Sequence, residues 1–146
     1  NQIYHTVTGR IKTLDKSFIP LFMRSDLATQ KLFALVAAMA YDTLFFDFVY
    51  EVIREKMILG TTELSDSDVR VFFKDKQQQN EKVAGWTDAT LVRLGRCYKT
   101  MLYEAGVIDK AKTARKILRP ILDPELVRWL NQNDMGVYVK ALAGVR

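Results

Sequence analysis

The chain has 146 residues, of which 49% are hydrophobic and 27% are charged, and its formal net charge is +5. This length and composition are typical of one globular domain or two very small ones. The single cysteine, Cys97, excludes an intramolecular disulfide. It lies near the apolar edge of its predicted helix, which favours a reduced, cytoplasmic protein.

Few residues could support catalysis. The chain has one histidine, His5, so imidazole chemistry has little support. The sequence shows no HExxH motif, no Cys/His set with zinc spacing, no Ser-His-Asp set and no glycine-rich phosphate loop. We therefore expect a protein that is not an enzyme and that uses no metal or other cofactor.

The first predicted element is the end of an amphipathic helix over residues 1–14. Its apolar residues recur at helical spacing and are Ile3, Val7, Ile11 and Leu14. Its polar face carries His5, Arg10 and Lys12. A short helix over 18–23 follows, with Pro20 in the first turn, where proline is tolerated.

Two strongly hydrophobic helices are predicted next. Asp26 caps the first, which runs to about residue 40, and Asp42 caps the second, which runs from 43 to about 58 and ends at Gly60. Residues 32–53 are apolar enough to suggest a membrane span, but Asp42 and Asp47 interrupt them. Each aspartate would cost roughly 2.5–3.5 kcal/mol at the centre of a bilayer. We therefore expect two core helices and no membrane partner.

Helices also dominate the second half of the chain. Ser65, with Asp68 as a variant capping box, starts a helix over 65–79, and residues 80–87 are a connection. Thr87 caps a helix that runs to residue 105 and stops at Gly106. Gly95 costs this helix about 1 kcal/mol relative to alanine and would let another backbone approach. An extended connector near 113–122 precedes helices over 124–130 and 137–143.

These elements predict an all-α fold, a multi-helix globular domain containing a helix-turn-helix-like unit. We divide it into a helical core over 1–60 and a helix-turn-helix-like part over 61–146 packed on the same core. The helices over 65–79 and 87–105 form the unit. Their connection of about eight residues is longer than the usual turn of three or four.

The excess positive charge lies in residues 86–122, which hold eight basic and three acidic side chains. A helix face and a following loop with this charge attract the phosphates of a duplex, although such faces are commonly only solvated. For Tyr103 we favour packing on a neighbouring helix. The candidate DNA-binding residues are Thr90, Arg93, Arg96, Lys99, Tyr103, Lys110, Lys112, Arg115 and Lys116.

A second candidate surface lies on the helix over 43–58. Its carboxylates Asp47, Glu51 and Glu55 are spaced by four residues, which is the usual pattern of a solvated helix face. The carboxylates could also dock another protein, and so could an aromatic patch on the same helix. We expect the patch to lie in the core instead. That patch consists of Phe45, Phe46 and Phe48.

Two stretches carry a family resemblance over about residues 20–110. They are the junction VIREKMILGTTEL between two helices and, some two dozen residues later, a helix with the pattern T-L-x-x-L followed by ML-x-EAG. This order and spacing resemble the BrxA family of bacteriophage-exclusion (BREX) defence systems.

The resemblance implies an all-helical, cytoplasmic, non-enzymatic component of a phage-defence system that binds double-stranded DNA and works with other BREX components. It also implies a longer chain with a first helix-turn-helix upstream. Residues 1–14 would close that unit, so Arg10 and Lys12 belong to a second candidate DNA-binding helix. The family has been likened to the RNA-binding antitermination factor NusB, so RNA binding and a protein adaptor role are the alternatives. We expect a monomer whose binding is mainly electrostatic.

Overall fold

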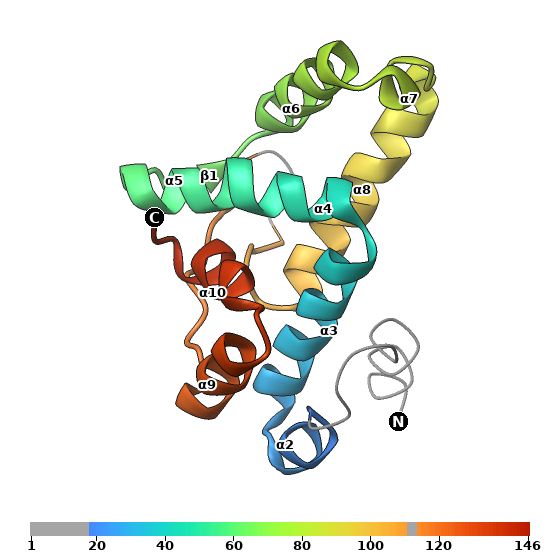
Figure 1. Cartoon of the computed structure of the whole chain (residues 1–146). Coiled ribbons are helices and arrows are strands. Elements are labelled where there is room, and N and C mark those ends of the chain that lie inside the picture. Colours follow the sequence, from blue (N-terminus) through green and yellow to red (C-terminus); the bar gives the residue numbers. More distant parts are fainter. Residues whose placement is uncertain (1–17, 111–113) are drawn as a thin grey trace. The chain divides into compact units, whose positions relative to one another are not determined.

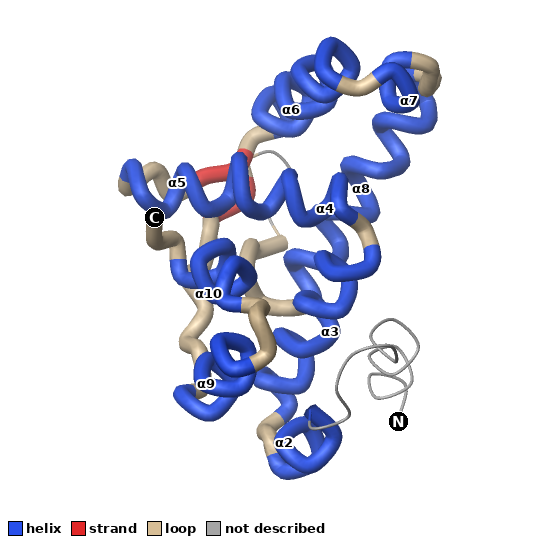
Figure 2. The backbone as a smooth tube through the Cα atoms, in the orientation of Figure 1, coloured by secondary structure: helices blue, strands red, loops and turns tan. Residues whose placement is uncertain are grey.

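The computed structural model describes residues 18–110 and 114–146. In this part of the chain the backbone is helical apart from loops and two short strands, which confirms the predicted all-α class (Figures 1 and 2). The predictions for residues 1–14, including His5, Arg10 and Lys12, lie outside the described residues. The same holds for Lys112.

Packing divides the chain into two compact units. Unit 1 contains the described residues 18–61 together with Arg119–Arg146, and unit 2 is Thr62–Leu118. The division expected from the sequence instead placed residues 119–146 with the second part, over 61–146. The last two helices pack on the first segment because their apolar side chains complete its core.

Unit 1 is helical throughout its regular elements. These are α2 (Phe18–Arg24), α3 (Leu27–Tyr41), α4 (Thr43–Phe48), the π-helical segment η1 (Val49–Ile53), α5 (Arg54–Leu59), α9 (Pro124–Gln132) and α10 (Gly136–Ala143). The predicted caps are confirmed: Asp26 accepts from the Thr29 N–H at 2.8 Å, and Asp42 accepts from the Leu44 N–H at 3.0 Å.

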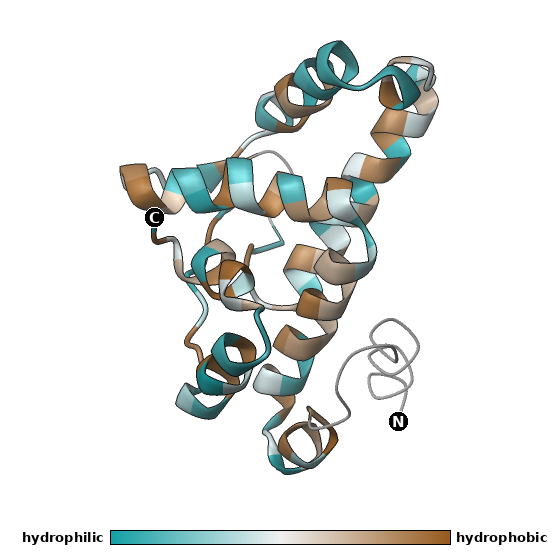
Figure 3. Ribbon diagram, in the orientation of Figure 1, coloured by the Kyte–Doolittle hydropathy of each residue, from teal (hydrophilic) through white to brown (hydrophobic). Residues whose placement is uncertain are grey.

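Aromatic rings join α9 to α2 and α3 in the core of unit 1. The Trp129 ring lies 6.2 Å from Phe18 and 5.7 Å from Phe33, measured between centroids. Phe45 and Phe48 of α4 have no exposed surface, so their predicted placement in the core is confirmed. Phe46, the third residue of that predicted patch, is only half-buried and lies against the Tyr138 ring. Figure 3 shows the hydrophobic character of α3 and α10 along the ribbon.

The long hydrophobic stretch forms two helices. Among the described residues, no single helix is long and apolar enough to cross a membrane. The helices over Leu27–Tyr41 and Thr43–Leu59 meet the length and composition criteria only as a pair, and the chain bends by 112° between them. The bend lies at Asp42, the residue that ends one helix and caps the next.

The predicted helix over 43–58 contains a π turn that the sequence did not indicate. In η1 the Arg54 N–H bonds to the Val49 carbonyl, five residues earlier. The Arg54 side chain is buried, and its guanidinium donates to the carbonyls of Tyr50 at 3.0 Å and Val145 at 3.3 Å. It also pairs with Glu55 at 2.8 Å. Arg54 therefore fixes the C-terminal segment of unit 1 to this helix.

Unit 2 places three helices between short extended segments. Its elements are β1 (Glu63–Leu64), α6 (Asp66–Gln79), α7 (Glu81–Ala84), α8 (Asp88–Glu104) and β2 (Arg115–Lys116). The predicted capping box at Ser65 and Asp68 is confirmed, and so is the Thr87 cap of α8. Residues 80–87 were predicted as a plain connection. Asn80 instead caps α7, because its side chain accepts from the Lys82 N–H at 2.9 Å.

The extended segments of unit 2 pair around residues 115–118. Glu63 faces Lys116 and Leu64 faces Arg115 in antiparallel register. On the other side the Leu118 N–H donates to the Val107 carbonyl at 2.7 Å, and Ile108 forms a bridge with Ile117. Residues 107–109 and 115–118 therefore form a hairpin after α8, which agrees with the expected extended connector near 113–122.

Candidate nucleic-acid interface

The outward face of α8 carries a narrow stripe of exposed polar side chains. Arg93, Arg96, Thr100 and Tyr103 are all exposed. At about 100° per residue they fall within about 80° of arc, so they point in similar directions. The opposite face, with Tyr98 and Leu102, is buried. The two arginines can therefore meet a ligand without moving the helix.

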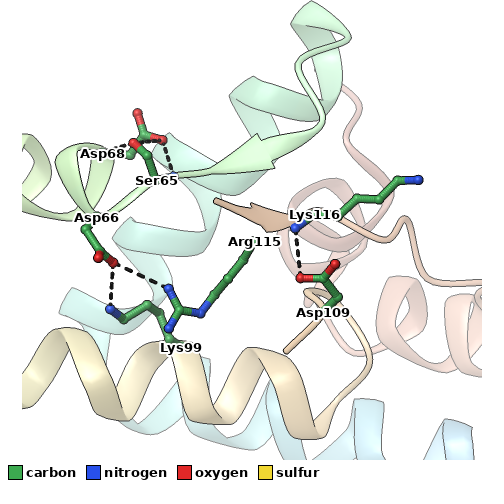
Figure 4. Close-up of polar contacts among 7 residues, drawn as sticks. All are labelled: Ser65, Asp66, Asp68, Lys99, Asp109, Arg115 and Lys116. Carbon is green, nitrogen blue, oxygen red and sulfur yellow. Dashed lines mark hydrogen bonds and ion pairs between the residues drawn. The ribbon is translucent and has the colours of Figure 1, made fainter. Parts of the chain in front are cut away.

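Lys99 and Arg115 turn away from that stripe toward one carboxylate. The Lys99 ammonium lies 3.0 Å from Asp66 Oδ1 and the Arg115 guanidinium lies 3.4 Å from the same atom (Figure 4). Their side chains are only 16% and 19% exposed, whereas Asp66 is 49% exposed. The hydrogen bond from Lys99, together with the nearby cations, lowers the pKa of Asp66. Asp66 therefore neutralises part of the predicted positive surface.

Lys116 and Lys110 remain at the surface of the hairpin. Both are exposed, and no ion pair involves either of them within residues 18–110 and 114–146. Figure 4 shows the Lys116 ammonium extending away from Asp109. Its backbone N–H donates to the Asp109 carboxylate at 3.0 Å, which ties the end of β2 to the opposite side of the hairpin. The hairpin thus adds two cations to those of α8.

Three residues on α8 differ from their predicted surroundings. Thr90 is half-buried and its hydroxyl lies 3.1 Å from that of Thr87, so it takes part in the helix cap. Tyr103 is 45% exposed, which leaves it open to solvent. Cys97 is also exposed and does not lie at the apolar edge, because the buried side of α8 is centred on Tyr98.

Sequence reasoning missed two exposed cations on α6. Arg70 and Lys74 are one turn apart and both are exposed. Arg70 also contributes to the lowered pKa of Asp66. The signal was present, since Asp66, Arg70 and Lys74 are spaced by four residues on one predicted helix. Within the described residues, no three histidine, cysteine or acidic side chains are grouped as a metal site.

Comparison with known proteins identifies the family. A model of the BrxA family matches residues 1–134 of the chain. The chain belongs to the BrxA family. A BREX protein BrxA from Bacillus cereus is 38% identical over 143 residues, which cover 98% of this chain and 72% of that protein.

An experimentally solved protein structure shares the fold of this chain. The crystal structure of an uncharacterized protein from Magnetospirillum magneticum superposes with a TM-score of 0.80 and 19% identity. The match covers 92% of this chain and 70% of that chain. At this identity it shows the fold alone. The resemblance stated from the sequence is therefore confirmed, and membership of the BrxA family supports a role in BREX phage defence.

Proposed function

We propose that this chain is a non-enzymatic component of a BREX system that binds double-stranded DNA through unit 2. The observation that carries the proposal is the exposed stripe on α8, which includes Arg93 and Arg96, in a unit ordered strand, three helices, hairpin. We compare the two long helices of this unit, α6 and α8, with the two helices of a helix-turn-helix module, although α7 lengthens the connection between them. In such modules the second long helix enters the major groove and its early residues meet base edges.

The cations have separate roles in this proposal. Arg93 and Arg96 are the side chains on α8 that can make bidentate contacts to guanine. Lys110 and Lys116 on the hairpin suit the phosphate backbone, which gives affinity without sequence information. Lys99 of α8 and Arg115 of the hairpin both pair with Asp66. They contribute to DNA binding mainly through the electrostatic field of unit 2. Binding should therefore be salt-dependent and weakly selective.

The test is fluorescence anisotropy of a labelled duplex of about 20 base pairs, titrated with the protein at about 0.15 M salt. The double variant Arg93→Ala/Arg96→Ala is expected to bind at least about tenfold more weakly. The matched control is Arg128→Ala/Lys140→Ala, which removes two exposed cations from α9 and α10 of unit 1. Equal affinities for both double variants, with intact helical circular dichroism, would contradict the assignment to α8.

Competition separates duplex DNA from RNA. An unlabelled duplex should displace the probe at lower concentration than a structured RNA, because the major groove of duplex RNA is too narrow for a helix. The alternative was a protein adaptor that docks partners through an aromatic patch. It loses support, because Phe45 and Phe48 of that patch are fully buried.

A further inference from the structure

A groove runs between α6 and α8 within unit 2, beside the stripe described above. Its volume is about 630 Å³. It is lined by Asp66, Ser67, Val69, Arg70, Val71, Phe73, Lys74, Gln77, Asp88, Leu91, Val92, Gly95, Arg96 and Lys99. Its α6 side runs from Asp66 to Gln77, which corresponds to about 18 Å or about three helical turns. The groove is therefore long enough for a segment of regular secondary structure.

The floor of the groove is apolar. Val69 and Phe73 of α6 lie beneath it, and Gly95 of α8 contributes no side chain there. On the rims Val71 and Val92 are 54% and 55% exposed, although both are aliphatic. Apolar side chains that line a groove and remain open to water are typical of a binding surface. They would gain free energy if a partner covered them.

The charge around this floor is positive. Arg70, Lys74 and Arg96 are exposed lining residues, and no ion pair involves them in the described part of the chain. The carboxylate of Asp66 is already paired with Lys99 and Arg115. Asp88 lies in the first turn of α8, where the helix dipole favours a negative charge. Arg70 and Lys74 are thus left to complement carboxylates on a ligand, and Arg96 lies on the edge that the groove shares with the stripe on α8.

We propose that this groove docks an amphipathic helix of a partner protein, with a row of aliphatic side chains flanked by carboxylates. Helix-in-groove recognition places apolar residues from successive turns in the floor and leaves the flanking charges for the rims. A phosphate backbone could pair with the cations but fits the groove less well, because it offers few apolar groups to cover Val71 and Val92. The inference goes beyond DNA binding, since it assigns a protein ligand to a neighbouring face.

The probe is a displayed library of peptides about four helical turns long, with aliphatic residues fixed at helical spacing and the flanking positions randomised. The library is selected on the full chain and counter-selected on the Val92→Glu variant, whose added carboxylate lies in the groove. Selected peptides should be enriched in aspartate and glutamate. Their binding should weaken about tenfold in Arg70→Glu/Lys74→Glu and be unchanged in the matched Arg128→Glu/Lys140→Glu variant.

Three outcomes would overturn the proposal. The first is that no peptide is enriched, and the second is that enriched peptides lack acidic residues or bind the groove variants equally well. The third is that duplex DNA or structured RNA, and no peptide, loses affinity in Arg70→Glu/Lys74→Glu, which would make the groove a nucleic-acid surface. Arg93→Ala, which lies outside the groove, distinguishes the two proposals because it should weaken DNA binding and leave peptide binding intact.

Discussion

Gly95 of α8 lies directly against Val69 of α6. A Cβ atom at Gly95 would be 3.0 Å from Val69 Cγ1 and 3.7 Å from the Phe73 ring. The sequence suggested that a backbone approaches this glycine, whereas the structure places two side chains there. The missing Cβ lets α6 pack closely against α8 at the floor of the groove.

Gly95→Leu should therefore separate α6 from α8. We expect it to lower the free energy of unfolding by about 1–2 kcal/mol, because overpacking outweighs the better helix propensity of leucine. Urea denaturation followed by circular dichroism measures the change. Thr100→Leu, at an exposed position of the same helix, is the control and should leave stability within about 0.5 kcal/mol. A Gly95→Leu protein as stable as the control would contradict the close packing.

Asp66 should make the stability of unit 2 depend on pH. Its pKa is lowered in the folded protein, so its contribution is present above the ordinary aspartate pKa and is lost as the pH falls through the lowered value. At pH 7 we expect Asp66→Asn to reduce the free energy of unfolding by about 0.2–1 kcal/mol, since the pair is half-exposed. Denaturation of both proteins at pH 7 and at about pH 3 should show the difference shrinking at low pH. A difference independent of pH would mean that the ion pairs do not form.

Gly144 should be much less tolerant of a side chain than Gly60. Both have positive φ angles, +70° and +77°, which cost other residues about 1–2 kcal/mol. A Cβ at Gly144 would also overlap the Met57 side chain, whereas nothing lies within 4 Å of a Cβ at Gly60. We expect Gly144→Ala to destabilise the protein by about 2–4 kcal/mol and Gly60→Ala by about 1–2 kcal/mol. Thermal denaturation measures the loss of stability in each variant. Equal losses in the two variants would exclude the contact between Gly144 and Met57.

Cys97 provides a chemical check on the outward face of α8. Because its thiol is exposed, it should react with a maleimide in the native protein without prior denaturation. Cys97 is close in sequence to Arg93, Arg96 and Thr100, so bound duplex DNA should slow the reaction several-fold. Mass spectrometry of timed samples measures both rates, with Cys97→Ser as the unlabelled control. A thiol that reacts only in denaturant would show that this face is covered.

Short-range signals made most helix boundaries predictable. Asp26, Asp42, Ser65 and Thr87 each accept hydrogen bonds within three residues, so the pattern that identifies a cap is complete in the local sequence. The glycine that ends α5 is equally local, since Gly60 adopts the left-handed conformation itself. The fold class and the helix order follow from such signals together with helical periodicity.

Long-range features were not predictable in the same way. The two-residue strand β1 exists only because it pairs with residues about fifty positions later. Lys99 turns toward Asp66, which is 33 residues away in sequence, so a helical wheel wrongly grouped it with Arg93 and Arg96. The same helical wheel placed Cys97 near the apolar edge of α8, whereas its side chain is exposed. The exposed arc of this helix is wider than the positions of its polar residues indicated. Such contacts depend on how α6 and α8 pack, which the periodicity of either helix alone does not contain.

The π turn at η1 joins α4 and α5 into one continuous helix. It sets the direction in which the side chains of α5 point relative to those of α4. A π turn holds one residue more than an α turn, and each residue of an α-helix advances by about 100°. Deleting Val52 would return the helix to regular geometry and rotate every later side chain around the axis by that amount. Arg54 would then lose its bond to the Val145 carbonyl, and Met57 would leave the space beside Gly144. One inserted position thus keeps the end of the chain attached to unit 1.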